Sequence, residues 1–419
     1  MKLAAIALLL TTALAAPLAA QTPEQVAAAA LKAAPIWDGH NDVPIQLRGR
    51  YGNVLADFDF HDTTHAKAYG EGEATPMHTD LPRLREGKVG AQFWSVYVSS
   101  ALTEPQAVQT TIEQIDLTKR LIAAYPDDLA LALNSADVEK ALKAGKIASL
   151  IGMEGGHSIG SSLGVLRQMY DLGARYLTLT HSKNTPWADS ADDVPAHGGL
   201  SDFGKDVVRE MQRIGMLVDL SHVNIDTMMD ALDVARAPVI FSHSNALALN
   251  GDSRNVPDNV LQRLKANGGI IMITGVPNFL NEAQRQWIAA EAAEKARLGS
   301  LFQGQPDRVA ADLASWTAAN PMPPATTTDM ADHIDHVRQV IGVDHIGIGG
   351  DYDGIPAGPV GMEDVRSYPV LFTELARRGY SQADLEKISN RNMMRVLKAA
   401  ESYSAAHRTD PVIETAVPG

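Results

Sequence analysis

Residues 215–244 read GMLVDLSHVNIDTMMDALDVARAPVIFSHS, and this stretch decides the fold. It begins with a short apolar run at Met216–Leu220, continues with an amphipathic helical stretch at Asn224–Ala235, and ends with a second apolar run at Val239–Ser242. Short apolar runs joined by a helix are typical of a βαβ unit, in which the two strands are parallel. The stretch therefore predicts an α/β fold with a parallel sheet.

The same alternation continues on both sides of this stretch, and eight apolar runs are found in all. Eight strands with intervening helices predict a closed (β/α)8 barrel of the TIM type, and an open doubly wound sheet is the alternative that counting strands leaves open. The predicted strands are Ile36–Asp42, Ala91–Val98, Ala148–Met153, Tyr176–Thr180, Met216–Leu220, Val239–Ser242, Gly269–Thr274 and His345–Gly349. The other helical stretches between them are Pro105–Ala124, Ser161–Leu172, Gly204–Ile214 and Pro257–Ala266.

Two segments interrupt this alternation. Residues 44–88 are polar and rich in His and Gly, which predicts an extended loop after the first strand. Residues 281–330 are rich in Ala, Glu and Pro, which predicts a helical insertion. Loops and insertions of this length are usually functional. We expect one barrel domain over residues 21–403 and a flexible tail over residues 404–419.

The first twenty residues, MKLAAIALLLTTALAAPLAA, have the composition of a targeting segment. One lysine precedes an apolar run that ends in small residues, which is the pattern of a cleaved secretory signal. No later stretch reaches about 18 uninterrupted apolar residues, the length needed to span a membrane. We therefore expect an exported, soluble protein, either periplasmic or secreted.

The net charge and the cysteine content argue against some classes of function and of metal site. The chain has 419 residues, with 36 Lys and Arg against 50 Asp and Glu, and its formal net charge is −14. This charge opposes nucleic-acid binding and attachment to an anionic membrane through a basic face. There is no cysteine, so any metal must be held by His, Asp or Glu.

Histidines and acids cluster at the carboxyl ends of the predicted strands. In an α/β barrel these ends meet at one face, which carries the active site. A buried imidazole or carboxylate without a partner costs several kcal/mol, and a metal ion would offset that cost. The set exceeds the needs of one tetrahedral zinc and favours a two-metal site. Its members are His40, Asp42, Glu154, His181, His222, His243 and Asp351.

Other readings of these residues stay open. Residues 156–160 match the G-x-S-x-G pattern of a serine hydrolase, with Ser158 as nucleophile, although three residues intervene between the apolar run and this pattern. A non-catalytic zinc-binding protein would leave Asp351 and His181 without a purpose. The remaining histidines are interpreted as structural or exposed, His333 among them because it lies on a predicted helix.

Taken in order, several motifs give a specific resemblance. Together they resemble the membrane (renal-type) dipeptidase family of the amidohydrolase superfamily, over residues 38–354. The motifs are DGHND (38–42), EGGHS (154–158), RYLTLTH (175–181), NTPWAD (184–189), LVDLSHV (217–223), PVIFSHS (238–244), SRNVPD (253–258) and GGDYDG (349–354).

The resemblance implies a barrel of the metal-dependent amidohydrolase kind that holds two Zn²⁺ ions per chain. His40 and Asp42 would bind the first zinc, His222 and His243 the second, and Glu154 would bridge them. A metal-bridging hydroxide would attack the amide bond of a dipeptide, including one with a D-residue at its C-terminal position. The alternative reaction is hydrolysis of another amide or of a β-lactam ring by the same metal ions.

The resemblance also implies roles for three further residues. Asp351 would act as general base and then as general acid, and Asp353 is the alternative residue for this role. His181 would bind the scissile carbonyl group and stabilise the oxyanion. Arg254 would bind the C-terminal carboxylate of the substrate; its alternative is a surface ion pair with Asp252 or Asp258. Animal relatives carry cysteines and a lipid-anchor signal that this chain lacks, so we expect no membrane anchor. Family members often form homodimers, and the resemblance extends that expectation to this chain.

Overall fold

Eight parallel strands close into a barrel in the computed structural model, which describes residues 21–70 and 72–414. Neighbours around the ring pair in the order β1, β2, β4, β5, β6, β7, β8, β9, and β9 pairs again with β1. The predicted barrel is confirmed. The strands are β1 (Ile36–Asn41), β2 (Val89–Tyr97), β4 (Ile147–Glu154), β5 (Ala174–Thr178), β6 (Leu217–Asp219), β7 (Ile240–Phe241), β8 (Ile270–Ile273) and β9 (Ile346–Ile348).

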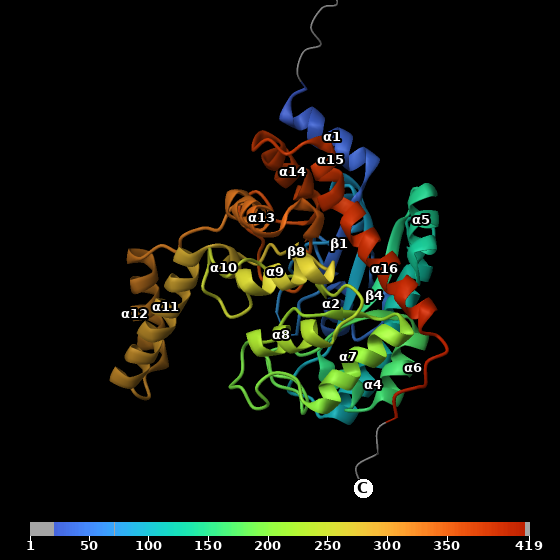
Figure 1. Cartoon of the computed structure of the whole chain (residues 1–419). Coiled ribbons are helices and arrows are strands. Elements are labelled where there is room, and N and C mark those ends of the chain that lie inside the picture. Colours follow the sequence, from blue (N-terminus) through green and yellow to red (C-terminus); the bar gives the residue numbers. More distant parts are fainter. Residues whose placement is uncertain (1–20, 71, 415–419) are drawn as a thin grey trace, which may run out of the picture.

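Helices surround the barrel (Figure 1). Several of them are followed almost directly by the next strand. Gly173 after α6 and Gly215 after α7 adopt left-handed backbone conformations, which end each helix one or two residues before a strand. The helices are α1 (Pro23–Ala33), α2 (Val43–Tyr51), α3 (Leu81–Glu86), α4 (Glu104–Ala124), α5 (Ser135–Lys143), α6 (Leu163–Leu172), α7 (Asp202–Ile214), α8 (Ile225–Val234), α9 (Asp258–Asn267), α10 (Pro277–Leu280), α11 (Glu282–Leu301), α12 (Pro306–Ala319), α13 (Thr327–Ile341), α14 (Tyr368–Arg377), α15 (Gln382–Glu386) and α16 (Asn392–Ala406).

The predicted insertion at 281–330 contains two helices, α11 and α12, that project from one side of the molecule as a hairpin (Figure 1). The rings of Trp287 and Trp316 hold the hairpin together at a centroid distance of 5.8 Å. The Trp287 indole N–H also donates to the Asn320 carbonyl oxygen at 2.6 Å. Within residues 306–319, no side chain of α12 is buried.

Four points of the sequence prediction need correction or limits. The segment 44–88 is not one extended loop, because α2 occupies Val43–Tyr51 and α3 occupies Leu81–Glu86. A ninth strand, β3 (Leu129–Leu131), was not predicted; it pairs with the first three residues of β4, outside the ring. Helix α16 continues to Ala406, three residues into the predicted tail. The predicted signal at 1–20 and residues 415–419 lie outside the described part of the chain.

The strand register aligns the carboxyl ends of the barrel. Glu154 is the last residue of β4 and pairs with Tyr97 of β2 on one side and Thr178 of β5 on the other. Thr178 pairs in turn with Asp219 of β6. Side chains at these positions therefore lie at one level of the barrel mouth.

Of the helices that the structure describes, none combines the length and the apolar character that crossing a membrane requires.

Candidate metal centre

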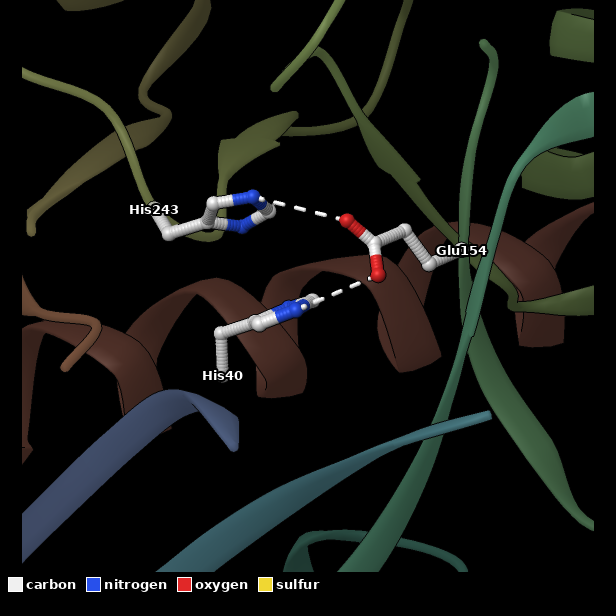
Figure 2. A group of neighbouring side chains, drawn as sticks. All are labelled: His40, Glu154 and His243. Carbon is white, nitrogen blue, oxygen red and sulfur yellow. Dashed lines mark ion pairs between the residues drawn. The ribbon is translucent and has the colours of Figure 1, made fainter. Parts of the chain in front are cut away.

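The carboxylate of Glu154 lies at the centre of the candidate site. Its Oε2 atom lies 3.4 Å from His40 Nε2. Its Oε1 atom lies 2.9 Å from His222 Nε2 and 3.6 Å from His243 Nε2. Figure 2 shows Glu154 between the rings of His40 and His243, with one oxygen directed to each. Residues from four strand ends thus meet around one carboxylate.

The remaining predicted residues adjoin this carboxylate or the rings beside it. His181 Nε2 lies 3.7 Å from Glu154 Oε1. His40 Nε2 lies 3.3 Å from Asp42 Oδ2 and 3.9 Å from Asp351 Oδ1. All seven predicted strand-end residues are therefore brought together. Three groups have ligand atoms close enough to share an ion: His40, Glu154 and His243; Glu154, His181 and His222; and His40, Asp42 and Asp351.

The chemistry of these donors fits divalent cations. His222 Nε2 and His243 Nε2 lie only 3.0 Å apart. Burial, together with nearby positive charge, lowers the pKa values of both imidazoles well below the ordinary value, so that both rings are neutral, as metal ligation requires. His40 Nε2 and His222 Nδ1 are buried and have no hydrogen-bond partner. Imidazole nitrogens and carboxylate oxygens in this number suit zinc better than magnesium or calcium, which prefer oxygen ligands alone.

Unusual backbone conformations occur at the site. His222, Asp351 and Asp353 have φ angles of 69°, 59° and 66°, in the left-handed region that non-glycine residues rarely adopt. Such strain clusters at functional sites, where the surrounding structure holds it in place. Gly354 is required for space, since a Cβ atom there would overlap Asp42 Oδ2 and lie 2.5 Å from Asp351 Oδ1.

Two buried aspartates, neither of them predicted from the sequence, hold the strand ends in position. Asp38 accepts the backbone N–H groups of His40 at 3.1 Å and Gly350 at 2.8 Å, which joins the ends of β1 and β9. Asp219 accepts the Ser242 hydroxyl at 2.6 Å, and that hydroxyl lies 2.8 Å from His243 Nδ1. An aspartate two or three residues before a strand-end histidine, in DGH and DLSH, is the signal that could have found them.

The centre opens into a cavity of about 410 Å³. Arg254 lines it but is only 2% exposed, and it makes no surface ion pair of the kind considered from the sequence. Its Nε and Nη1 atoms have no partner, and Nη2 donates only a long bond, 3.5 Å, to the His243 carbonyl oxygen. A buried cation with unmet donors is costly, so the arrangement fits an anionic ligand. The other lining residues are Asp42, Ile45, Gln46, Tyr69, Tyr97, Glu154, His181, His222, Val276, Phe279, Asp351, Asp353, Gly354 and Ile355.

Of two alternatives from the sequence, the geometry opposes the serine nucleophile and leaves Asp353 at the cavity wall. The Ser158 hydroxyl, proposed as a serine nucleophile, is fully buried in a short 3-10 turn (Gly156–Ile159), has no hydrogen-bond partner, and does not line the cavity. A nucleophilic serine needs a base within hydrogen-bond reach. Asp353, the fallback for Asp351, accepts the His78 N–H at 2.8 Å and donates its own N–H to His78 Nδ1 at 3.0 Å. Asp353 thus ties residue 78 to the loop after β9.

Comparison with known proteins places the chain in a family. Residues 24–411 match the model of the membrane dipeptidase family, peptidase family M19. The chain is 41% identical to dipeptidase 3 of Macaca fascicularis over 389 residues, which cover 92% of this chain and 69% of that protein. It is also 41% identical to dipeptidase tcpJ of Claviceps purpurea over 391 residues, which cover 91% of this chain and 81% of that protein.

Solved structures share the fold at lower identity. The probable dipeptidase PvdM from Pseudomonas aeruginosa superposes with a TM-score of 0.74 at 22% identity, over 91% of this chain and 99% of that chain. A metallo peptidase from Rhodobacter sphaeroides, liganded with a phosphinate mimic of the dipeptide L-Ala-D-Ala, gives 0.70 at 23% identity, over 88% and 99%. The chain therefore belongs to the membrane dipeptidase family, peptidase family M19, and is a metallo-dipeptidase.

Proposed function

We propose that this metallo-dipeptidase holds two zinc ions and hydrolyses the amide bond of free dipeptides. The position of Glu154 carries the proposal, because its two oxygens face different histidines, His40 on one side and His222 with His243 on the other. A single carboxylate placed in this way can bridge two cations. In two-metal hydrolases the ions lie about 3.5–4 Å apart and share such a ligand.

His40 and Asp42 would hold the first ion with Glu154 Oε2, and His222 and His243 the second with Glu154 Oε1. When bound, the ions would polarise the scissile carbonyl group and make a water molecule nucleophilic near neutral pH. The buried aspartates contribute indirectly. Asp219, through the Ser242 hydroxyl, fixes the ring of His243, as outer partners of metal-binding histidines commonly do.

Asp351 would take the proton of the attacking water and give it to the leaving amine. It lines the cavity beside His40 and Asp42. Burial raises its pKa well above the ordinary value, and the negative charges of Asp42 and Glu154 act in the same direction. A carboxyl group that exchanges a proton during turnover works best when its pKa lies near the working pH.

His181 and Arg254 would bind the substrate at either side of the reacting carbonyl group. His181 lines the cavity, and its side chain is 20% exposed, so it can donate to the oxyanion of the tetrahedral intermediate. Arg254 would bind the C-terminal carboxylate through its unmet N–H groups. A fixed cation one residue beyond the scissile bond limits the enzyme to dipeptides.

Two finer properties complete the proposal. Acceptance of a D-residue at the C-terminal position is supported by the Rhodobacter sphaeroides structure, which holds a mimic of L-Ala-D-Ala. Export to the periplasm or beyond the cell is supported by the composition of residues 1–20.

The proposal is tested by metal removal together with a substrate panel. Chelator-treated protein should lose activity toward L-Ala-L-Ala and L-Ala-D-Ala and regain it with zinc, with two zinc ions bound per chain by elemental analysis. Ala-Ala-Ala, L-Ala-L-Ala amide and a β-lactam serve as comparison substrates and should be cleaved far more slowly. Full activity in metal-free protein, one zinc ion per chain, or faster cleavage of a comparison substrate would contradict the proposal.

A further inference from the structure

The loop after β8 forms an apolar wall of the cavity beside Arg254. Val276 is only 5% exposed, and Phe279 follows it on α10. Both line the cavity. Neither side chain offers a hydrogen-bonding group, so this wall contacts a ligand only through apolar surface.

This wall is fixed to the segment that carries Arg254. The Asn255 side chain donates to the Phe279 carbonyl oxygen at 2.9 Å, and the Asn250 side chain donates to the Asn278 carbonyl oxygen at 2.8 Å. Asn255 is the residue next to Arg254 in the chain. The guanidinium and the wall therefore form one rigid unit, in which the position of a bound carboxylate also fixes the distance from its substituents to the wall.

The distances place the wall within reach of one part of the substrate. The Phe279 ring centroid lies 5.5 Å from Arg254 Cζ. A carboxylate that accepts guanidinium N–H groups has its carbon about 4 Å from Cζ, given ordinary hydrogen-bond lengths. The Cα atom of the C-terminal residue is one bond further, so a side chain directed toward the ring is within reach of van der Waals contact.

We propose that Phe279 and Val276 bind the side chain of the C-terminal residue and select dipeptides in which that residue is apolar and of medium size, such as leucine. The inference rests on the proposed role of Arg254. Glycine leaves the wall without a contact. A lysine or glutamate side chain loses hydration there and finds no partner. The cavity's other aliphatic lining residues are Ile45, in the first turn of α2, and Ile355, in the loop after β9.

The test measures kcat/KM of the zinc-loaded protein for L-Ala-L-Leu, L-Ala-Gly, L-Ala-L-Glu and L-Ala-L-Lys. The leucine dipeptide should be favoured over the other three by about tenfold or more, since even one methylene in an apolar pocket discriminates by about that factor. F279A should reduce the leucine-to-glycine ratio to about 1–3, mainly by raising KM for L-Ala-L-Leu, because the contact is present in the ground state and the transition state alike. F279L should retain most of the preference.

Ile288→Ala is the matched control, because this apolar side chain is 41% exposed on α11 and does not line the cavity. It should leave the ratio unchanged. Zinc content and thermal unfolding of F279A and F279L show whether each variant is folded. Equal turnover of the four dipeptides by the wild-type protein, or an unchanged ratio in folded F279A, refutes the inference alone. Cleavage of none of the four refutes the proposed function and, with it, the inference.

Discussion

Replacing Arg254 by methionine should weaken binding of free dipeptides and stabilise the fold at the same time. The substrate carboxylate can accept two of the guanidinium N–H groups that have no partner in the protein. Hydrogen bonds to charged groups contribute about 1.5–3 kcal/mol each, so two of them at the lower bound give about 3 kcal/mol. This corresponds to a loss of about 100-fold in kcat/KM, expressed mainly in KM.

The same substitution should raise the stability of the fold, although it weakens dipeptide binding. Arg254 is 2% exposed, and its positive charge lacks a paired carboxylate in the free protein. Methionine has a similar length and no charge, and replacing buried ion pairs by well-packed apolar groups is often neutral or stabilises proteins by about 1–4 kcal/mol. Thermal unfolding of the metal-loaded variant should therefore occur at a higher temperature than that of the wild-type protein.

The assay compares R254M and wild type on L-Ala-L-Leu and on its C-terminal amide. The amide lacks the negative charge, so its slow hydrolysis should change little between the two proteins. An equal loss on both substrates would show that Arg254 acts on the reaction rather than on the carboxylate. A large drop in the unfolding temperature would instead assign Arg254 a structural role.

Three further predictions follow from single contacts. Gly354→Ala should lower kcat by 100-fold or more without unfolding the chain, because its Cβ would displace the Asp42 carboxylate; near-normal turnover would contradict this. Asp219→Asn should weaken zinc affinity about 10- to 100-fold, measured by competition with a chelator, and unchanged affinity would remove its positioning role. His333 accepts the Ala246 N–H at 3.0 Å, and burial lowers its pKa to about 4. Because the unfolded chain binds this proton near pH 6.5, His333's contribution to stability is complete above that pH and falls by about 3 kcal/mol by pH 4. Urea unfolding at pH 7 and pH 4.5 should show a smaller loss of stability in H333Q than in the wild type, and equal losses would contradict the assignment.

The barrel and the cluster around Glu154 could be predicted because both depend on local patterns. Each barrel strand is a short apolar run, and His40, His222 and His243 each stand where such a run ends. The parallel barrel then brings these ends together, so that position along the chain was enough to predict proximity. This is why all seven strand-end residues are found in one cluster.

Features that depend on contacts between distant segments were not predictable. Strand β3 has three residues and is defined only by its pairing with β4. The burial of Arg254 depends on packing among loops that no periodicity describes, so the sequence alone left a surface ion pair open as the alternative to carboxylate binding. Asp38 and Asp219 resemble ordinary strand residues until their partners across the barrel are known.

The strand ends at the barrel mouth contribute unequally to the candidate metal ligands. Among the described residues, no member of the three candidate ligand groups comes from the loop after β8. That loop instead carries the wall at Val276 and Phe279 and leads directly into the α11–α12 hairpin. Residues 275–326 contribute no candidate metal ligand, and of these residues only Val276 and Phe279 line the cavity. Substitutions at these two positions would therefore change the apolar wall and leave every candidate ligand in place.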